Sequence, residues 1–576
     1  MSVAPDRIAA EQRTAVGVGR QGLIEDLILL SILMVLAGCG LVYEFLLSHY
    51  AARVLGATEV AIFGVFTIMI ASMGIGAFLA QRVACPFTGF AWLEWVIGVL
   101  GAVAILVTAA AITATYVLPN LIAYTYGVVD VHPEGSVVHA LQQVATSLPY
   151  VMAFLLGCLI GAEIPLIARV REQVHAKRLQ HNTGTLYGID YIGAGIGALL
   201  FVFFLLRMEA SLAAAIVASV NLVMGLVFFL RYRQRIRAWW WLLSGHLVAG
   251  AVVVTVALAG PAWQVEMEDM LYKDQVIYSS HTPFQRFVVT RRIMDPAKPP
   301  VYALFINGHA QFSSRDERLY HAMLTYPAMA ASARHERVLI VGGGDGLALR
   351  DVLRWDPKQV TLIDLDRQII DFFTQPKTVD GRVINTPLLA LNRHSFRDPR
   401  VHVLIGDAFN RVDELLTGEQ RFDTIIIDLP DPNHPDLGKL YSTRFYAKLY
   451  QLLAGDGALV TQSTSPYHAR RTFISIGKTL KAAGFSSVEQ YHANVPTFGE
   501  WGWTIAVPHG RSASDRLREF AHLPVDDGWT TREWLLGAFA FPKGFFDASE
   551  QVAINRLDSN VLYDYYRDDW RAENDF

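Results

Sequence analysis

The chain has 576 residues, of which 52% are hydrophobic and 18% are charged. This balance is unusual for a wholly soluble protein and predicts that part of the chain lies in a membrane. The formal net charge of -4, with no long run of like charge, gives no support to a basic arm, so we expect no nucleic-acid partner.

Seven apolar runs precede Trp263, and each is long enough for a membrane-spanning helix, which needs about 20 residues. The small-residue strings GIGAFLA, GCLIGA and IGAGIGALL allow the close helix approach that is typical of packing in lipid. No small-residue cleavage pattern follows the first run closely, which favours an uncleaved span over a signal peptide. The predicted spans are 27–47, 60–80, 92–118, 141–167, 186–206, 210–230 and 239–259.

Lys and Arg concentrate in alternate loops between these runs. The N-terminal segment and the loops after the second, fourth and sixth runs carry twelve of them, whereas the other loops carry only Arg53 and Arg207. This bias predicts a cytoplasmic N-terminus in a multi-pass protein of a bacterial-type inner membrane. Seven spans would then deliver the C-terminal half to the outer side, where no nucleotide cofactor is normally supplied. The sequence leaves the side of the catalytic domain open.

Four ionisable residues, Glu44, Glu163, Asp190 and His246, fall within or near the ends of the spans. One interpretation is that Glu163 and Asp190 lie close to an interface and pair with a loop arginine, because pairing lowers the cost of such positions. The other is a path or site for a cationic substrate. All three cysteines, at 39, 85 and 158, also lie in the apolar half, so we expect no disulfide framework, catalytic thiol or cysteine metal site in the polar half.

After Pro261 the long apolar runs end and shorter strand-like runs begin. Short runs such as RFVVT predict a small antiparallel β unit, and from Arg337 strand-like runs alternate with helical ones. This alternation is typical of a mostly parallel sheet in a Rossmann-like α/β domain of the class I methyltransferase type. The predicted domains are a transmembrane helical domain at 1–262, a small β domain at 263–330, a Rossmann-like nucleoside-binding catalytic domain at 331–510 and a helical C-terminal extension at 511–576.

The stretch VLIVGGGDGLALR passes from a strand through a glycine-rich turn into a helix. Gly342 and Gly344 allow the backbone to approach a ligand closely, and the helix N-terminus offers free N–H groups. Asp364, at the end of the next strand, stands where an acid commonly accepts hydrogen bonds from ribose hydroxyls. Asp345 would repel a phosphate, so the turn favours a nucleoside with a positive group, such as an S-adenosyl sulfonium compound.

Further acids follow the next two strands. Asp407 closes the third strand and could accept a hydrogen bond from the exocyclic amine of a base. Asp428 and Asp431 flank a proline turn at the end of the fourth strand in IIIDLPDPNHP. Together with Asp345 they predict an anionic pocket that attracts a cation. The alternative for this stretch alone is that Asp428 caps the turn and Asp431 is solvated.

The motifs INGHAQFSSRDERLYHAML, VLIVGGGDGLALR, TLIDLD, GDAF and IIIDLPDPNHP, in this order and spacing, resemble those of the spermidine synthases, or polyamine aminopropyltransferases. The resemblance covers about 285–507. The GEWGW stretch and the seven-span half look like the membrane-fused branch of that family.

The resemblance implies transfer of the aminopropyl group of decarboxylated S-adenosylmethionine, a co-substrate with no further cofactor, to putrescine or a related diamine. The products would be spermidine and 5'-methylthioadenosine. It also implies the roles of individual residues. Asp428 would be the catalytic base and would bind the amine together with His321, Asp345 and Asp431. The nucleoside would be bound by Gln285, Gly342, Gly344, Asp364, Asp407, Ala408 and Pro435.

The chemistry requires such acids. A diamine is almost wholly protonated at neutral pH, so one carboxylate must take a proton from the attacking nitrogen while another holds the distal ammonium. General-base assistance is typically worth ~10²–10⁴-fold. The sulfonium is already a good leaving group, and no metal-ligand cluster is apparent in the polar half, so we expect no metal.

Three positions depart from the usual pattern of the soluble enzymes. Leu347 and His434 replace glycines, and Asp364 replaces a glutamate. Asp for Glu keeps the acceptor on a shorter arm, so ribose binding should survive. His434, near the expected acceptor pocket, could alter which amine fits.

Two other functions stay open at this level. One is an S-adenosylmethionine-dependent amine N-methyltransferase, which must accommodate the extra carboxylate of its donor. The other is a polyamine transporter or sensor without turnover, which would explain the ionisable residues in the spans. The expected partners are a diamine and the lipid bilayer, and a homo-oligomer is left open. The tail at 511–576 carries no chemistry that the sequence reveals.

Overall fold

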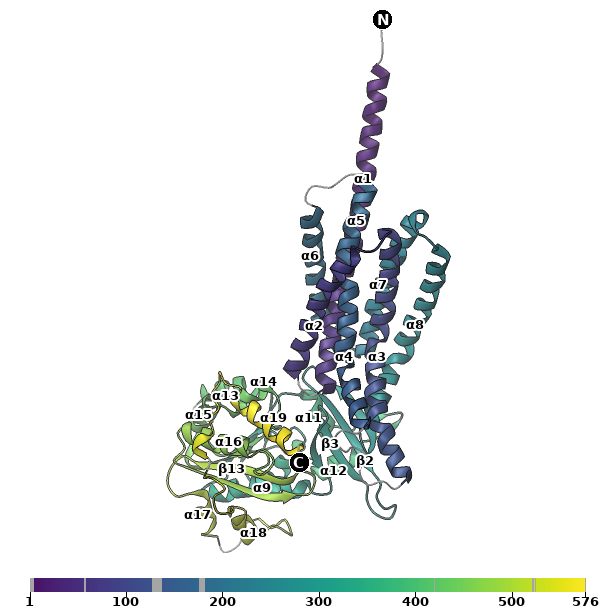
Figure 1. Cartoon of the computed structure of the whole chain (residues 1–576). Helices are drawn as coiled ribbons and strands as arrows, with labels where there is room; N and C mark the ends of the chain where they lie inside the picture. Colours follow the sequence, from purple (N-terminus) through teal and green to yellow (C-terminus); the bar gives the residue numbers. More distant parts are fainter. Residues whose placement is uncertain are drawn as a thin grey trace. The chain divides into compact units, whose positions relative to one another are not determined.

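The computed structural model describes residues 5–55, 58–126, 137–175, 182–418, 420–520, 523, 525–547 and 549–574. It divides into two compact units, Met1–Lys273 and Asp274–Phe576 (Figure 1). The boundary between the units lies later in the chain than the predicted boundary at 262/263, because the last helix of the first unit continues through Pro261 to Asp269.

The first unit consists of long apolar helices that run alongside one another (Figure 1). Seven stretches are long and apolar enough to cross a membrane, and each overlaps one of the seven predicted runs. Ala162 interrupts the fourth stretch, which therefore comprises two helices. The helices are α1 (Pro5–Leu55), α2 (Thr58–Ala80), α3 (Pro86–Tyr126), α4 (Val137–Gly161), α5 (Glu163–His175), α6 (Asn182–Phe203), η1 (Leu205–Arg207), α7 (Ala210–Tyr232), η2 (Arg233–Arg235) and α8 (Trp239–Asp269).

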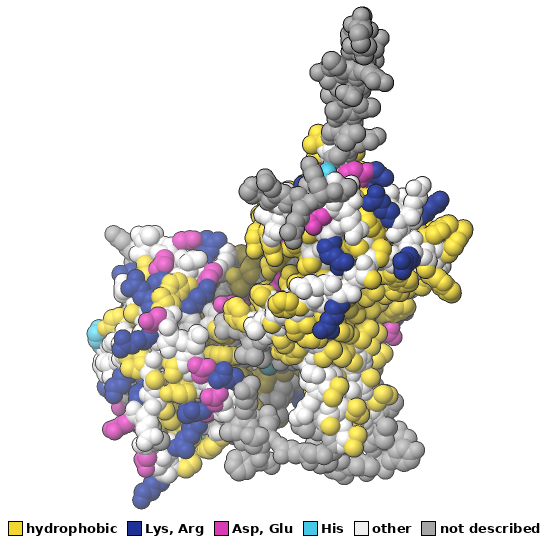
Figure 2. Space-filling view, turned by 45° about the horizontal axis from the view of Figure 1, so that its top comes forward, with side chains coloured by type: hydrophobic (Ala, Val, Ile, Leu, Met, Phe, Trp, Pro, Cys, Tyr) yellow, Lys and Arg dark blue, Asp and Glu magenta, His cyan; other side chains and the backbone are white. Residues whose placement is uncertain are grey.

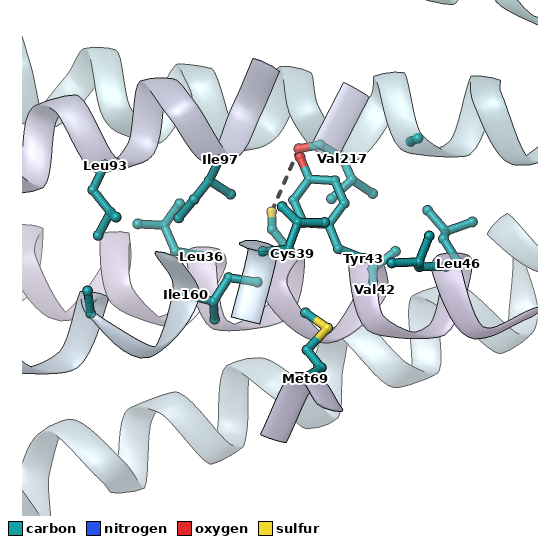
Figure 3. Packing of buried hydrophobic residues seen from close by; sticks show 14 of the residues in the cluster. Leu36, Cys39, Val42, Tyr43, Leu46, Met69, Leu93, Ile97, Ile160 and Val217 are labelled. Carbon is teal, nitrogen blue, oxygen red and sulfur yellow. Dashed lines mark hydrogen bonds between the residues drawn. The ribbon is translucent and has the colours of Figure 1, made fainter. Parts of the chain in front are cut away.

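The small-residue strings lie where these helices approach most closely. A Cβ at Gly193 on α6 would collide with the Met34 carbonyl on α1, and one at Gly76 on α2 would collide with the Cys158 carbonyl on α4. Larger side chains fill the space between such contacts, as around Tyr43 in the cluster of Figure 3. The predicted role of the strings in close packing therefore has a direct structural basis.

Large apolar side chains also cover much of the outside of the first unit (yellow in Figure 2). Phe78 is 73% exposed, Trp241 73% and Leu258 81%. A soluble protein rarely exposes so many large apolar side chains over adjoining helices, whereas a lipid-facing surface requires them.

Some of the ionisable side chains within the spans have specific partners. Arg171 on α5 donates to both carboxylate oxygens of Asp26 on α1, at 2.8 and 3.0 Å. Asn221 on α7 donates to Glu94 Oε2 on α3 at 2.7 Å, a buried pair that the sequence did not suggest. The other arginine of that loop, Arg169, donates to backbone carbonyls instead of Glu163. Two further basic residues of the loop, at 177 and 178, lie outside the described residues.

The second unit begins with a four-stranded antiparallel sheet, as the alternating runs predict. Its strands follow one another in chain order and pair as neighbours. They are β1 (Gln275–His281), β2 (Arg286–Arg292), β3 (Val301–Ile306) and β4 (His309–Ser313). The helix α9 (Glu317–Ala331) follows and is almost wholly buried.

The main sheet has seven strands in the order β12-β13-β11-β10-β5-β6-β9. Five of them are parallel, which confirms the predicted Rossmann-like α/β fold, and β12 and β13 add an antiparallel edge. The strands are β5 (Arg337–Gly342), β6 (Gln359–Asp364), β9 (Val401–Ile405), β10 (Phe422–Asp428), β11 (Leu453–Gln462), β12 (Ser487–Val495) and β13 (Gly499–Val507).

Helices cover the sheet and a short hairpin lies outside it. The central strands β5 and β10 are buried along nearly their whole length, which is why they are runs of Val, Leu and Ile. The remaining elements are α10 (Leu347–Leu353), α11 (Arg367–Thr374), β7 (Thr378–Val379), β8 (Arg382–Val383), α12 (Thr386–Leu391), η3 (Ser395–Arg397), α13 (Ala408–Leu416), α14 (Pro435–Gly438), η4 (Lys439–Tyr441), α15 (Thr443–Leu452) and α16 (Arg470–Ala482).

The C-terminal extension consists of short helices joined by loops. Its last helix packs against α14 and α16, and its Leu562 is fully buried in the core of the second unit. The elements are α17 (Ala513–Leu517), α18 (Arg532–Gly537), η5 (Ser549–Gln551) and α19 (Val561–Asn574).

Candidate active site

The predicted site residues gather at the carboxyl end of the parallel strands. The chain proceeds from β5 to β6 and β9 on one side and then returns to place β10 on the other side of β5. The last residues of the two strands, Gly342 and Asp428, are register partners. Sheets of this kind bind ligands at such a switch in strand order.

The glycine turn fits tightly between two carboxylates. Gly342 has a φ of 86°, and a Cβ there would collide with the Asp428 carbonyl. A Cβ on Gly343 would lie 3.3 Å from Asp428 Oδ2, and one on Gly344 would lie 2.7 Å from Asp364 Oδ2. The turn therefore needs glycine both for its left-handed backbone and to leave the two acids facing it undisturbed.

On one side of the turn, Asp364 ends β6. Its Oδ1 accepts a hydrogen bond from the Asp366 backbone N–H at 2.8 Å, which leaves Oδ2 facing the turn. Burial raises the pKa of Asp364 to about 7. Gln285 lies just before β2 and donates to Asp366 Oδ2 at 3.1 Å, so the antiparallel sheet reaches the same region. These predicted nucleoside-binding residues are brought together.

Asp407 stands at the start of α13, where its Oδ1 accepts from the Phe409 backbone N–H at 2.8 Å. Its other oxygen binds Lys439 Nζ at 2.5 Å, a partner that the sequence did not indicate. Ala408 and Pro435 are the first residues of α13 and α14. Both carboxylate oxygens of Asp407 thus have hydrogen-bond partners, and the exocyclic amine of a base could bind Asp407 only by displacing Lys439.

On the other side of the turn, Asp428 ends β10. Its Oδ1 accepts a hydrogen bond from Tyr320 Oη on α9 at 2.9 Å. Burial raises the pKa of Asp428 to about 6, the positive charge of His321 opposes the rise, and the negative charge of Asp345 adds to it. Asp345 belongs to the glycine turn that contacts Asp428, and His321 is next to Tyr320 on α9, so the structure brings Asp345, His321 and Asp428 to one place.

Asp431 follows in the proline turn. Its Oδ2 accepts from Thr464 Oγ1 at 3.2 Å and from Tyr566 Oη on α19 at 3.1 Å. Its Oδ1 is shielded from solvent and has no hydrogen-bond partner among the described residues. Burial raises the pKa of this carboxyl to about 6. The turn is itself fixed, because Tyr441 Oη donates to the Pro430 carbonyl at 2.8 Å.

His321 is buried on α9 and lies within a charged network. Its Nδ1 is 3.0 Å from Glu317 Oε2, and Arg350 on α10 donates to Glu317 Oε1 at 2.8 Å. Burial lowers the pKa of His321, but the hydrogen bond and charge of Glu317 outweigh it and bring the value to about 9. The same partners hold the pKa of Glu317 at about 2 against its burial. His321 therefore carries a positive charge at neutral pH.

Sequence reasoning missed several residues of this site. Tyr320 and Glu317 lie in the quoted RDERLYH stretch, where their spacing on a helix beside His321 could have indicated them. Thr464 and Tyr566 come from segments with no recognisable motif. His434, which we expect near the acceptor pocket, caps α14 by accepting from the Asp436 backbone N–H.

The arrangement suits a positively charged ligand. Asp345, Asp428 and Asp431 lie at one edge of the sheet, and Asp428 and Asp431 each keep an oxygen without a side-chain hydrogen-bond donor among the described residues. Asp364 lies across the glycine turn from them. Within the described part of the chain, no group of three or more His, Cys, Asp or Glu side chains is placed to hold a metal ion.

The chain is similar to known proteins over nearly its whole length. Residues 317–516 match the family model described as the spermine/spermidine synthase domain. The polyamine aminopropyltransferase of Shewanella oneidensis is 51% identical over 552 residues, 96% of each chain. Polyamine aminopropyltransferase 1 of Streptomyces coelicolor is 34% identical over 94% of each chain. A solved spermidine synthase in complex with the transition-state analogue AdoDATO is 24% identical and covers 48% of this chain and 88% of its own, with a TM-score of 0.41.

These full-length relatives confirm the family that the motifs indicated, and they include the apolar half as well as the catalytic half. An identity of 51% over 96% of both chains leaves no large part of the molecule without a counterpart. The chain therefore belongs to the polyamine aminopropyltransferase family and is an enzyme of that class.

Proposed function

We propose that the second unit transfers the aminopropyl group of decarboxylated S-adenosylmethionine to putrescine or a closely related diamine. The products are spermidine and 5'-methylthioadenosine. The observation that carries this proposal is the pair Asp428 and Asp431, each with one oxygen held by protein hydroxyls and the other oxygen left for a ligand. Family membership supports the same reaction.

In this reaction Asp428 is the base. The carboxylate takes one proton from the ammonium, and the electron pair of that N–H bond then forms the bond to carbon. The pKa of Asp428, about 6, lies below that of an alkylammonium, so the proton transfer is unfavourable by itself and is drawn forward by the attack that follows. Tyr320 fixes the carboxylate by donating to Oδ1, which directs Oδ2 toward the glycine turn. The electron pair of the breaking carbon–sulfur bond goes to the sulfonium, which leaves as a neutral thioether.

Asp431 grips the other end of the acceptor. Its free Oδ1 accepts from the distal ammonium, and with Asp428 it aligns the attacking nitrogen with the carbon–sulfur bond. Positioning of this kind replaces a bimolecular encounter by an oriented one and lowers the barrier by several kcal/mol, of order 7 in favourable cases. Asp345 contributes negative charge near the aminopropyl group.

The nucleoside lies across the glycine turn, with its ribose hydroxyls on Asp364 Oδ2. Gln285, Gly342, Gly344, Ala408 and Pro435 line this side. Asp407 binds the exocyclic amine of the base after Lys439 turns away. His321, which is cationic, offsets the negative charge of Asp345 and Asp428 until the positively charged substrates arrive.

We place the first unit in the inner membrane. Its seven apolar helices have sufficient length, and their outward faces carry large apolar side chains. The loop charges predict an N-terminus in the cytoplasm. The methyltransferase and transporter alternatives have no observation that favours them over aminopropyl transfer.

The reaction is tested with the purified full chain in detergent. Incubation with decarboxylated S-adenosylmethionine and putrescine should give equal amounts of spermidine and 5'-methylthioadenosine by mass spectrometry. A parallel incubation with S-adenosylmethionine should give no methylated amine. A methylated product without spermidine would overturn the proposal in favour of a methyltransferase, and ligand binding without any product would favour a sensor.

A further inference from the structure

The last described helix, α19, reaches the acceptor side of the site. Tyr566 Oη lies 3.1 Å from Asp431 Oδ2, although 135 positions separate the two residues in the chain. The helix α19 lies outside residues 317–516, which match the synthase domain. The contact therefore gives this otherwise unexplained segment a place next to the proposed chemistry.

Contacts along its length fix α19 in this position. Leu562 near its start is fully buried against the core of the second unit. Near its end, Asp569 accepts from Arg471 Nε at 2.5 Å, and Trp570 stacks on His468 with ring centroids 5.3 Å apart. These anchors lie on both sides of Tyr566, so its hydroxyl is held at Asp431 by the helix as a whole.

The segment that leads into α19 is also held. Asn555 is fully buried, and its Nδ2 donates to the Gly438 carbonyl at the end of α14 at 2.8 Å. The Asn555 carbonyl accepts from the Thr443 backbone N–H at 3.0 Å. Since α14 directly follows the turn that carries Asp431, these hydrogen bonds fix the C-terminal extension to the segment that holds the Asp431 carboxylate.

Thr464, the second donor to Asp431 Oδ2, has an uncommon backbone. Its φ is 59°, a region that β-branched residues rarely occupy and that persists only where the surroundings impose it. The Thr464 N–H donates to Gln462 Oε1 at 2.9 Å, and its carbonyl accepts from the Gly502 N–H at 2.8 Å. Two hydroxyls from unrelated segments are thus aimed at the same oxygen.

We propose that Tyr566 is a positioning residue for the acceptor amine. Together with Thr464 it occupies Asp431 Oδ2, so that Oδ1 is presented to the distal ammonium. This role rests on the proposed aminopropyl transfer, and it adds an element outside the synthase domain to the amine site.

The first test compares Tyr566→Phe with Tyr563→Phe in the full chain. Tyr563 lies on the same helix, where its ring faces the guanidinium of Arg567, and among the described residues it makes no hydrogen bond to Asp431, so it is a matched control. Loss of one hydrogen bond to a charged group should raise the KM for putrescine about tenfold in Tyr566→Phe, with affinity for 5'-methylthioadenosine unchanged. The control should match the wild type.

The pH profile provides a readout that a merely structural role would not move. The Tyr566 hydrogen bond lowers the pKa of Asp431 because it favours the ionised form. Its removal in Tyr566→Phe should shift the acid limb of kcat/KM for putrescine to higher pH. Thr464→Val should shift it in the same direction. An unmoved acid limb, or an equal loss of affinity for both substrates, would overturn the role.

If the wild type forms no spermidine, the proposed function fails and this role falls with it. If the wild type is active and Tyr566→Phe is indistinguishable from it, only the role of Tyr566 fails.

Discussion

Asp428 and Asp431 lie three positions apart, yet each is held by a different part of the chain. Tyr320 on α9 binds the first, and Thr464 and Tyr566 bind the second. Burial raises the pKa of both carboxyls to about 6, because water solvates the charged form better than the protein interior does. Ligand ammonium groups would relieve this cost, so the two residues are suited to a dication.

The Asp428→Asn variant should lose turnover. The amide keeps the shape of the side chain but cannot accept the proton, so we expect kcat to fall by ~10²–10⁴-fold. Affinity for 5'-methylthioadenosine, measured by calorimetry, should change little. Asp371→Asn on the exposed face of α11 is the control and should be fully active. Unchanged kcat in Asp428→Asn would remove this residue as the base.

The rate should depend on pH with an acid limb near 6. Both carboxyls have a pKa raised from 3.8, so they become protonated as the pH falls through about 6 and can then neither accept a proton nor hold an ammonium. We expect kcat/KM for putrescine to fall at least tenfold for each pH unit below 6. Its value at pH 7 should be higher than its value at pH 6. A rate that stays constant down to pH 4.5 would contradict the raised pKa values.

At the scale of single elements, the glycine turn connects the two halves of the site. The residues GGGDG at 342–346 lie between Asp364 on β6 and Asp428 on β10. A side chain at Gly343 would lie against the Asp428 carboxylate, and one at Gly344 would lie against the Asp364 carboxylate. A substitution in this turn should therefore displace the carboxylate of Asp364 or Asp428, and its effect on ligand binding should be larger than its effect on the free energy of unfolding.

Gly344→Ala should weaken nucleoside binding. Its Cβ would lie 2.7 Å from Asp364 Oδ2, so the carboxylate must move from the position proposed for the ribose hydroxyls. We expect the Kd for 5'-methylthioadenosine to rise about tenfold or more, as for the loss of a charge-assisted hydrogen bond. Gly455→Ala in β11, where the nearest atom is 3.8 Å away, is the control. Equal affinity of the two variants for 5'-methylthioadenosine would show that Asp364 does not bind the ribose hydroxyls.

The elements that the sequence could predict are those with a local signature. The parallel strands are apolar runs between helices, and the turn has glycines directly after a strand, so β5, β10 and their carboxyl ends were predictable. Tyr566 was not, because α19 has no motif and its contact with Asp431 depends on the tertiary packing of Leu562 and Asn555. Lys439 was missed for the same reason, since no spacing rule joins it to Asp407.

At the scale of the whole molecule, the proposed membrane location of the apolar half would decide where the reaction takes place. Seven apolar helices are an odd number, so an N-terminus in the cytoplasm would place the second unit on the outer side if all of them cross the bilayer. The nucleoside substrate would then have to be supplied there. The side of the membrane is therefore the property that most affects the physiological role.

Cys85 can report the topology. It lies in the partly exposed turn between α2 and α3, and Cys39 is buried. A membrane-impermeant maleimide should label Cys85 in inverted vesicles and not in intact spheroplasts, because the loop charges predict that this turn faces the cytoplasm. Protease should cleave the second unit in spheroplasts. Cys85→Ser is the control, and accessibility of both sites from one side would show that an even number of helices separates them.

Trp503 is fully buried, and its indole ring lies 5.7 Å from the ring of Tyr320, whose hydroxyl holds Asp428. Indole emission responds to electric fields, and a dication that docks beside Asp428 changes the field at this ring. The protein thus contains an intrinsic fluorophore beside its proposed reaction centre, and comparison with a Trp503→Phe variant would isolate its response to an amine from that of the other eleven tryptophans.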